Sequence, residues 1–361
     1  MDRQALKAAL EKCRTLPPEF YGDPHRHRRE LEQIFRQEWQ YAGPLDRVRE
    51  AGSYMTAVVA EVPIVVTRAL DGGLRGFVNV CRHRSAVVAS GCGRSRSLVC
   101  PYHAWTYSLD GSLIAAPRSE REASFDPTDF PLRPVRIDVW GPLVFVNLDQ
   151  EAPALADWLG DIPDMYAGTG LRIDDLAYRD RREYTLDINW KTYAENIVEC
   201  YHCPSVHPAF AGVFDLDDYE LEARARSSIQ RTRPRDRPRT AAADAYDFTG
   251  GVEDGLYVFV WPNFMANVSP GIGHFHTNSI QPLGPDRMVI MNDFFFVPEV
   301  STADADSYIG FQHQVSLEDI APLEAVARGL GSRAGLPGRL MQASEPLTQH
   351  FMQTYVEVME A

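Results

Sequence analysis

Short runs in which hydrophobic and polar residues alternate fill the first half of the chain, and this pattern is typical of half-buried β-strands. Glycine and proline turns separate the runs, which cover residues 54–67, 74–80, 97–100 and 139–148. Ahead of them, Pro24 begins a helical segment. The hydrophobic face of this segment is formed by Leu31, Ile34, Phe35 and Trp39. The pattern therefore predicts a helical segment followed by a compact β domain.

The second half of the chain mixes helical and strand patterns. A helix is predicted from Asn189, which suits an N-cap position, and two helical segments close the chain. The predicted strands between them cover residues 256–261, 273–282 and 287–297. This half is predicted as α+β. Because a domain holds about 150 residues, we divide the chain into an N-terminal helical segment (1–40) that packs on the last domain, a β domain (41–154) and a last domain (155–361).

The composition is that of an ordinary globular protein. Of the 361 residues, 45% are hydrophobic and 24% are charged. A net charge of −14 disfavours nucleic-acid binding. The first residues lack the apolar block of a signal peptide, and no run has the length of a membrane span. With six cysteines and no disulfide-scaffold pattern, we expect a cytoplasmic protein that binds neither membranes nor nucleic acids.

Two short Cys/His pairs carry the clearest chemistry. Cys81 stands two residues before His83, Cys100 stands three residues before His103, and sixteen residues separate the two pairs. Each pair offers one thiolate and one imidazole from a tight loop. Two such loops can hold a [2Fe-2S] cluster of the Rieske type, with the cysteines on one iron and the histidines on the other. A structural zinc site is the alternative, but zinc sites usually pair Cys with Cys and His with His.

The residues around the second pair, Cys100-Pro101-Tyr102-His103-Ala104-Trp105 followed by Tyr107-Ser108-Leu109-Asp110-Gly111, resemble the Rieske box of Rieske non-heme iron oxygenases. Ala104 replaces the glycine usual in that box, a change that we expect to be tolerated. The resemblance extends over most of the chain. It implies the α+β fold of an oxygenase subunit, in which a Rieske [2Fe-2S] β domain is joined to a helix-grip (START-like) antiparallel-sheet catalytic domain that binds mononuclear non-heme Fe(II).

An oxygenase needs an iron site with open positions. His202 and His207 flank the helix-breaking Pro204, so His202 is predicted at the helix end and His207 on the loop beyond it. Two imidazoles and one carboxylate leave positions open on iron. The resemblance assigns the carboxylate to Asp319. Its neighbour Glu318 is expected to point about 100° away on the same helix, and Glu324 and Asp293 are weaker candidates.

Glu199 precedes His202 by three residues, a spacing that places both on one face if the helix continues that far. In the family an acidic residue here bridges the iron-binding histidine to a cluster histidine of the neighbouring subunit, which would be His103. The resemblance thus implies a homotrimer, O2 as oxidant and an NAD(P)H-dependent flavin/ferredoxin-type reductase as electron donor. A purely orienting role for Glu199 is the alternative.

Other cysteines and histidines receive structural interpretations. Cys200 and Cys203 beside His202 are interpreted as small buried apolar residues. His274 and His276 share one strand face and are interpreted as satisfied or exposed strand residues, with a place in the pocket as the alternative. A segment rich in arginine and proline is predicted as an exposed loop, with a lid or a docking patch as its functional alternative. Its arginines are Arg231, Arg233, Arg235, Arg237 and Arg239.

The glutamate at position 199 and the stretches 261–265 and 292–296 resemble family members that oxidise quaternary ammonium compounds such as choline, glycine betaine, carnitine or stachydrine. We therefore predict hydroxylation of an N-methyl group, followed by N-demethylation. Aromatic faces bind methylated ammonium ions. The candidate cage residues are Phe210, Trp261, Phe264 and Tyr308, each with core packing as its alternative.

Three alternative functions remain open from the sequence. The first is ring hydroxylation of an aromatic acid, or tailoring of a secondary metabolite. The second is a Rieske electron carrier fused to a ligand-binding domain, and the third is a zinc-stabilised binding module. A pure carrier has no need of His202, His207 and Asp319.

Overall fold

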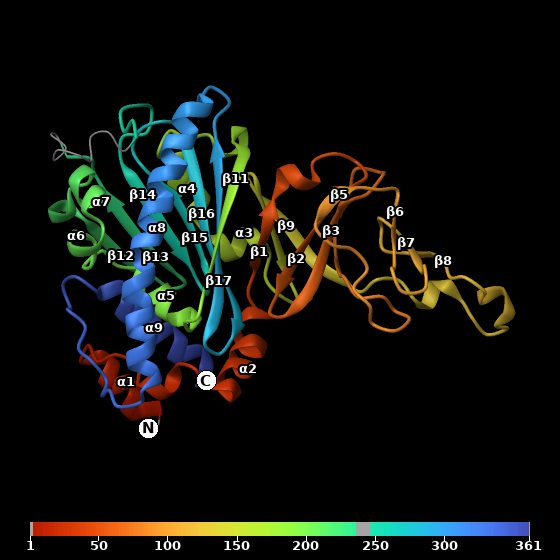
Figure 1. Cartoon of the computed structure of the whole chain (residues 1–361), viewed down its shortest axis with the longest axis horizontal. Coiled ribbons are helices and arrows are strands. Elements are labelled where there is room, and N and C mark those ends of the chain that lie inside the picture. Colours follow the sequence, from red (N-terminus) through yellow and green to blue (C-terminus); the bar gives the residue numbers. More distant parts are fainter. Residues whose placement is uncertain (1–2, 236–245, 361) are drawn as a thin grey trace. The chain divides into compact units, whose positions relative to one another are not determined.

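The structure is a computed structural model that describes residues 3–235 and 246–360. The chain divides into two compact units (Figure 1). The smaller unit is Phe35–Trp158, and the larger one joins Met1–Ile34 to Leu159–Ala361. The N-terminal segment thus belongs to the larger unit as far as Ile34, within the range that we expected to pack on the last domain.

The smaller unit is built from antiparallel β-strands in two sheets. The larger sheet has the order β1-β10-β9-β4-β3-β2-β5 and the smaller one the order β6-β7-β8. The strands are β1 (Gln40–Pro44), β2 (Ser53–Val59), β3 (Val62–Arg68), β4 (Leu74–Val78), β5 (Cys92–Arg94), β6 (Ser97–Val99), β7 (Thr106–Ser108), β8 (Leu113–Ala115), β9 (Pro134–Trp140) and β10 (Leu143–Asn147). The predicted β domain is therefore present.

Two of the predicted single strands are hairpins. The run 54–67 turns between β2 and β3 at Ala60 and Glu61, which adopt φ values of 48° and 64°. Neither residue belongs to the usual turn formers, so this turn could not be predicted from the residue types. The run 139–148 turns at Gly141 and Pro142, between β9 and β10.

The larger unit is organised around one seven-stranded antiparallel sheet of order β11-β17-β16-β15-β14-β13-β12. Its strands are β11 (Ala177–Leu186), β12 (Glu220–Arg224), β13 (Ser227–Thr232), β14 (Gly255–Val260), β15 (Phe264–Val268), β16 (His274–Gly284) and β17 (Arg287–Phe296). The long helix α8 (Thr302–Gly331) runs across this sheet in Figure 1. Together with the smaller unit, this is an α+β fold in which a β domain is joined to an antiparallel-sheet domain, as the sequence predicts.

Shorter helices complete the larger unit. They are α1 (Arg3–Glu11), α2 (Pro24–Glu30), α4 (Ile162–Ala167), α5 (Trp190–Ile197), α6 (Cys203–Val206), α7 (Pro208–Val213) and α9 (Pro346–Met359), while α3 (Leu155–Leu159) lies at the boundary between the units. None of the helices in the described ranges combines the length and the apolar character of a membrane span.

A buried ionic network anchors α5 to the N-terminal segment. Glu30 of α2 accepts hydrogen bonds from Lys191 Nζ (2.6 Å), Trp190 Nε1 (2.9 Å) and the Tyr355 hydroxyl (2.6 Å). Lys191 and Glu30 are almost fully buried. Burial raises the pKa of Glu30, but the Lys191 charge and the hydrogen bonds outweigh it, and the pKa lies below its ordinary value. Since a buried charge that has lost its partner is costly, this network fixes the position of α5.

Part of the arginine-rich segment lies within the described residues. Arg231 belongs to β13 and pairs with Glu222, Arg233 pairs with Asp218, and Arg235 pairs with Asp215. Arg237 and Arg239 lie outside the described residues, so the predicted loop is only partly described.

Candidate metal centres

The segment that carries the two histidines is less helical than predicted. Asn189 caps α5 by accepting the Lys191 N–H at 3.1 Å, as predicted, but the helix ends at Ile197. The carboxylate of Glu199 then accepts the backbone N–H groups of Tyr201 and His202 and stabilises an irregular turn. Glu199 and His202 therefore do not share a helix face. Pro204 lies in the first turn of α6, where its missing N–H costs nothing.

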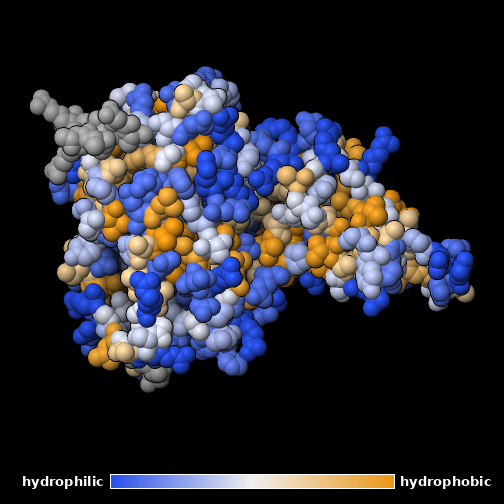
Figure 2. Space-filling view, viewed as in Figure 1, coloured by the Kyte–Doolittle hydropathy of each residue, from blue (hydrophilic) through white to orange (hydrophobic). Residues whose placement is uncertain are grey.

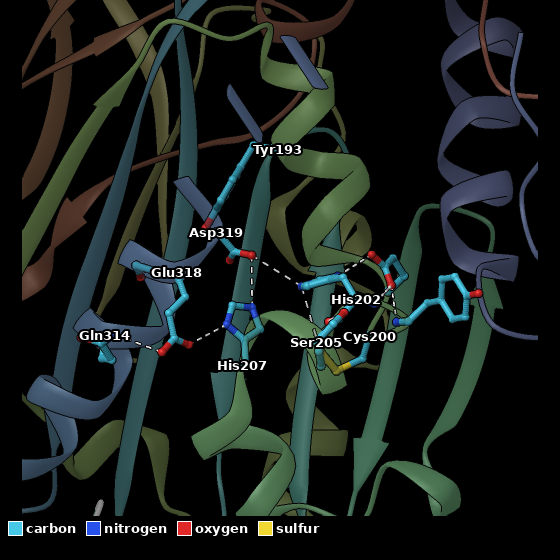
Figure 3. A network of polar contacts seen from close by, with 12 residues as sticks. Tyr193, Cys200, His202, Ser205, His207, Gln314, Glu318 and Asp319 are labelled. Carbon is cyan, nitrogen blue, oxygen red and sulfur yellow. Dashed lines mark hydrogen bonds and ion pairs between the residues drawn. A yellow bond between two sulfur atoms is a disulfide. The ribbon is translucent and has the colours of Figure 1, made fainter. Parts of the chain in front are cut away.

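Helix α6 separates the two histidines. His202 precedes α6, and His207 lies between α6 and α7. In Figure 3 their rings approach the Asp319 carboxylate, which comes from α8. Asp319 Oδ1 lies 3.5 Å from His202 Nε2 and 3.1 Å from His207 Nε2. All three side chains offer ligand atoms that lie within 4.8 Å of one another.

The Asp319 carboxylate has the character of a metal ligand. It is 7% exposed, and its Oδ1 accepts no hydrogen bond from any residue that the structure describes. A buried carboxylate oxygen without a donor is costly unless a cation satisfies it. Two imidazoles and one carboxylate form the facial triad that suits non-heme Fe(II). The residues present therefore fit a mononuclear iron.

A second carboxylate lies behind each imidazole. Glu199 Oε1 lies 2.5 Å from His202 Nδ1, and Glu318 Oε2 lies 3.0 Å from His207 Nδ1 (Figure 3). Carboxylates in this position fix the tautomer of a metal-binding histidine and aim its other nitrogen at the metal. Burial lowers the pKa of His207, but Asp319 and Glu318 outweigh burial and raise it above the ordinary value.

The contact of Glu318 with His207 was not anticipated. The helical angle correctly separates Glu318 from Asp319, yet His207 is close enough to both for each to reach one side of its ring. The weaker carboxylate candidates lie elsewhere. Asp293 is held by Arg181 through two contacts of 2.7 and 2.6 Å, and Glu324 pairs with Arg328 at the surface.

Our interpretation of Cys200 and Cys203 as separate apolar residues is wrong. Their sulfur atoms form a disulfide that encloses Tyr201 and His202 (Figure 3). Cys203 is buried, whereas Cys200 is partly exposed. The pair is too close in sequence to resemble a disulfide scaffold, which is why cysteine counting did not indicate it.

A cavity of about 110 Å³ opens onto the three candidate iron ligands. Aromatic rings from α5, α7, β14 and the residue before β12 line it, together with polar side chains from β13, β15, β16 and α8. The aromatic residues are Tyr193, Phe210, Tyr219 and Tyr257. The polar residues include Gln230, Asn267, His276, Asn278, Gln312 and Ser316.

Of the four predicted cage residues, only Phe210 is part of this lining. Trp261 packs against Phe351 and Trp190 in the core, and Phe264 is 1% exposed. Tyr308 lies behind the lining, where its hydroxyl is 2.9 Å from His276 Nδ1. Large aromatic residues fill cores as readily as cavities, so the sequence alone could not separate these positions.

His276 is buried and satisfied by the Tyr308 hydroxyl, as expected, and it also lines the cavity, which we had kept as the alternative. The alternation along β16 correctly indicated one common face for His274 and His276, whose rings both contact the Tyr308 ring. Tyr193, Tyr219 and Tyr257 had no comparable sequence signal.

The two Cys/His loops of the smaller unit share one backbone geometry. Cys81 N–H donates to Ala86 O and Cys100 N–H donates to Trp105 O, both at 2.8 Å. Four residues after each cysteine, Ser85 and Ala104 both adopt a φ of 57°, and each donates its N–H back to the cysteine carbonyl. The positive φ explains why a glycine is usual at the position of Ala104.

The loops separate the thiols from the imidazoles. Cys81 and Cys100 are each 2% exposed, while His83 and His103 are exposed. The two imidazole rings lie 4.5 Å apart, and His83 stacks on Trp105. Buried thiols and exposed imidazoles form the asymmetric donor set of a Rieske cluster, which these residues therefore fit. Val87, Val99, Tyr102 and Ile114 of the smaller unit are exposed. Figure 2 shows hydrophobic residues on the surface of this unit.

Comparison with known proteins agrees with both sites. Residues 38–131 match the Rieske [2Fe-2S] domain, and residues 173–361 match the ring hydroxylating alpha subunit (catalytic domain). The chain is 33% identical to a chloroplastic choline monooxygenase of Arabidopsis thaliana over 359 residues, covering 96% of this chain and 83% of the relative. It is 30% identical to the carnitine monooxygenase oxygenase subunit of Escherichia coli (strain K12) over 336 residues, covering 91% of this chain and 88% of the relative.

Among solved structures, the quaternary ammonium Rieske monooxygenase CntA in complex with L-carnitine has a TM-score of 0.85 and 28% sequence identity. The similarity covers 97% of both chains. Because two family models and full-length relatives agree, the chain belongs to the Rieske non-heme iron oxygenase alpha subunits, oxidoreductases that carry a Rieske [2Fe-2S] cluster and a mononuclear non-heme iron.

Proposed function

We propose that this oxygenase hydroxylates an N-methyl group of a small quaternary ammonium compound and thereby removes that group. The observation that carries the proposal is the small cavity that combines the triad with four aromatic side chains. A tetraalkylammonium ion cannot donate a hydrogen bond, so aromatic faces are its natural binding partners. The similarity to choline and carnitine monooxygenases supports the same substrate class.

The proposed reaction is a monooxygenation. An N-methyl C–H bond, O2, NADH and one proton give an N-hydroxymethyl group, water and NAD⁺. The N-hydroxymethyl group then loses formaldehyde as its C–N bond breaks, which leaves a tertiary amine and releases one proton. One oxygen atom of O2 enters formaldehyde and the other enters water, and NADH supplies the two electrons through a reductase.

In this proposal His202, His207 and Asp319 hold the iron, which when bound supplies the reduction of O2 next to the substrate. Glu199 and Glu318 fix the two imidazoles from behind. Cys81, His83, Cys100 and His103 hold the cluster that receives electrons from an NAD(P)H-dependent flavin/ferredoxin-type reductase.

The family resemblance further suggests a head-to-tail homotrimer, in which Glu199 connects His202 to His103 of the neighbouring subunit. The hydrogen bonding of Glu199 supports this assignment. Glu199 Oε1 contacts His202 Nδ1, and a carboxylate has enough lone pairs to accept from a second imidazole. This route would explain how the cluster of one subunit passes electrons to the iron of the neighbouring subunit.

The proposal is tested by turnover of the iron- and cluster-loaded protein with a promiscuous reductase and NADH. We would offer methylated ammonium compounds and aromatic acids in parallel, and measure formaldehyde and hydroxylated products. Formaldehyde in proportion to NADH consumed is the expected result. Hydroxylated products from aromatic acids alone would refute the N-demethylation proposal.

A further inference from the structure

The cavity has a polar wall at some distance from the candidate iron ligands. Gln312 stands seven residues before Asp319 on α8, with Val315 and Ser316 of the same cavity between them. Seven residues make two helical turns, or about 10 Å along the axis. His276 of β16 lines the same cavity. The cavity thus runs from the triad toward Gln312.

Most amide groups of this wall are already engaged. Asn278 Nδ2 donates to the Tyr193 hydroxyl at 3.3 Å and to Asn292 Oδ1 at 3.0 Å, and Asn278 Oδ1 accepts from Asn267 Nδ2 at 2.6 Å. These hydrogen bonds fix the amides within the protein. They leave little capacity for binding a ligand.

Three atoms of the wall remain available among the described residues: Gln312 Oε1, His276 Nε2 and Asn267 Oδ1, whose own amide nitrogen is engaged by Asn278 and the His276 carbonyl. Gln312 Nε2 donates to the Tyr308 hydroxyl at 3.1 Å, and the same hydroxyl lies 2.9 Å from His276 Nδ1. No other described residue forms a hydrogen bond with Gln312 Oε1 or His276 Nε2, and protein atoms do not seal either atom from the cavity. Gln312 Oε1 is an acceptor. When Tyr308 donates to Nδ1, His276 Nε2 carries the hydrogen and is a donor.

The wall carries no positive charge. Lysine and arginine are absent from the described residues that line the cavity, and the charged groups there belong to the triad and Glu199. Burial lowers the pKa of His276 to about 3, so this imidazole is neutral. Three arginines outside the lining, Arg231, Arg233 and Arg235, are each paired with a carboxylate that is also outside it. A substrate carboxylate at this wall would face an amide oxygen and find no cation.

We propose that Gln312 and His276 bind the hydroxyl group of a trimethylammonium alcohol such as choline, and that the cavity discriminates against trimethylammonium carboxylates such as glycine betaine. A hydroxyl can donate to Gln312 Oε1 and accept from His276 Nε2, whereas a carboxylate can only accept. This inference rests on the proposed function and assigns its substrate.

The same placement selects the carbon that reacts. With the hydroxyl held two turns from Asp319, the ammonium end of the substrate points toward the triad. The aromatic rings of Phe210 and Tyr257, whose centres are 6.5 Å apart, line the same cavity. An N-methyl group then lies next to the iron ligands, and the carbon that bears the hydroxyl lies farther away. The products are formaldehyde and the corresponding dimethylamino alcohol.

The test compares choline, glycine betaine and tetramethylammonium with the full chain. Formaldehyde formation gives kcat/KM, and calorimetric titration of the loaded protein without reductase gives binding. We expect kcat/KM for choline to exceed that for glycine betaine at least tenfold, with the same order in binding. Tetramethylammonium has no tail and serves as the matched control.

Two variants separate the tail from the ammonium group. Gln312→Leu should lower kcat/KM and affinity for choline about tenfold, the size of one lost hydrogen bond, and should change the same two constants for tetramethylammonium much less. Gln312→Lys should instead raise kcat/KM and affinity for glycine betaine. If Gln312→Leu binds and demethylates choline as wild type does, or if the wild type prefers glycine betaine, the inference is overturned while N-demethylation stands.

The failure of the proposed function has a different signature. If neither these three compounds nor the wider series of methylated ammonium compounds yields formaldehyde, N-demethylation is refuted. The calorimetric series then still decides the tail site, because loss of choline binding in Gln312→Leu supports it and unchanged or absent binding contradicts it.

Discussion

Glu318 and Asp319 are adjacent in α8, and they reach opposite sides of the same imidazole: Glu318 Oε2 lies 3.0 Å from His207 Nδ1, and Asp319 Oδ1 lies 3.1 Å from His207 Nε2. One helix thus supplies both a candidate iron ligand and the group that orients another. Because such orienting carboxylates contribute about 10–100-fold to metal affinity, we expect Glu318→Ala to weaken Fe(II) binding by that factor. Competition with a chelator measures this affinity.

Two further variants make this measurement specific. Glu318→Gln retains a hydrogen-bond acceptor and should recover part of the affinity. Glu324→Ala removes a carboxylate from the exposed side of the same helix and should have no effect. Equal Fe(II) affinity in Glu318→Ala and wild type would show that His207 needs no support from Glu318.

Glu199 is expected to serve electron transfer as well as orientation. A carboxylate accepts hydrogen bonds at two oxygens, whereas the glutamine amide has only one oxygen. Glu199→Gln should therefore keep the contact with one imidazole and lose the proposed electron route to the second imidazole. We predict that both metal centres load normally while turnover is blocked. Iron content, the visible spectrum and product formation are measured together.

The matched control for this variant is Glu195→Gln, the same exchange four residues earlier in α5, at a residue whose carboxylate contacts Tyr21. It should retain turnover. Full activity of Glu199→Gln at normal iron content would exclude Glu199 from the electron route.

Ala104 adopts a left-handed backbone conformation in the second cluster loop, with φ of 57°. A side chain in this region costs about 1 kcal/mol relative to glycine. Ala104→Gly should therefore raise the free energy of unfolding of the cluster-bearing unit by about 1 kcal/mol. Chemical denaturation followed by cluster absorbance measures the change.

Ala115 is the control for this prediction, because it lies in the extended strand β8. Glycine there should destabilise the unit by about 0.5–1 kcal/mol. If both glycine variants are destabilised equally, the positive φ of Ala104 does not carry the cost that we assign to it.

Glu195 predicts a pH dependence of stability. Burial raises its pKa to about 7, although the Tyr21 hydrogen bond and the Lys191 charge both lower it. The pKa of Glu195 in the folded protein lies above its value in the unfolded chain. The contribution of the protonated Glu195 side chain to the free energy of unfolding is therefore fully present below pH about 4.5 and is lost as the pH rises through about 7. Glu195→Gln cannot ionise. It should be more stable than wild type at pH 8, by up to about 3 kcal/mol.

Melting curves at pH 5 and pH 8 decide the matter. The advantage of Glu195→Gln should be large at pH 8 and small at pH 5. A constant difference between the two proteins at both values would mean that Glu195 does not titrate in this range.

Features formed by neighbouring residues could be predicted from the sequence, and features formed by distant residues could not. The Cys81/His83 and Cys100/His103 loops are local, and so are His202 and His207. Asp319 lies more than a hundred residues from His207 in the sequence, and only the family resemblance connected them.

The sequence-based predictions were wrong where three-dimensional contacts determine the position of a residue. Trp261 and Phe264 are residue types that form cation cages, but both are buried in the core. The cavity is lined instead by Tyr193 and Tyr257. Proline at 204 signalled a helix end, yet α5 had already ended at Ile197, because the Glu199 carboxylate stabilises the intervening turn. Such side-chain contacts with the backbone have no periodic pattern.

The central claim is that His202, His207 and Asp319 form the reaction centre and that the cluster only supplies electrons. The most direct test compares formaldehyde formed per NADH by wild type and Asp319→Ala with choline as substrate. We predict that Asp319→Ala retains the visible absorption of the Rieske cluster, loses mononuclear iron and forms no formaldehyde. Formaldehyde at the wild-type rate from Asp319→Ala would contradict the assignment of the reaction to this triad.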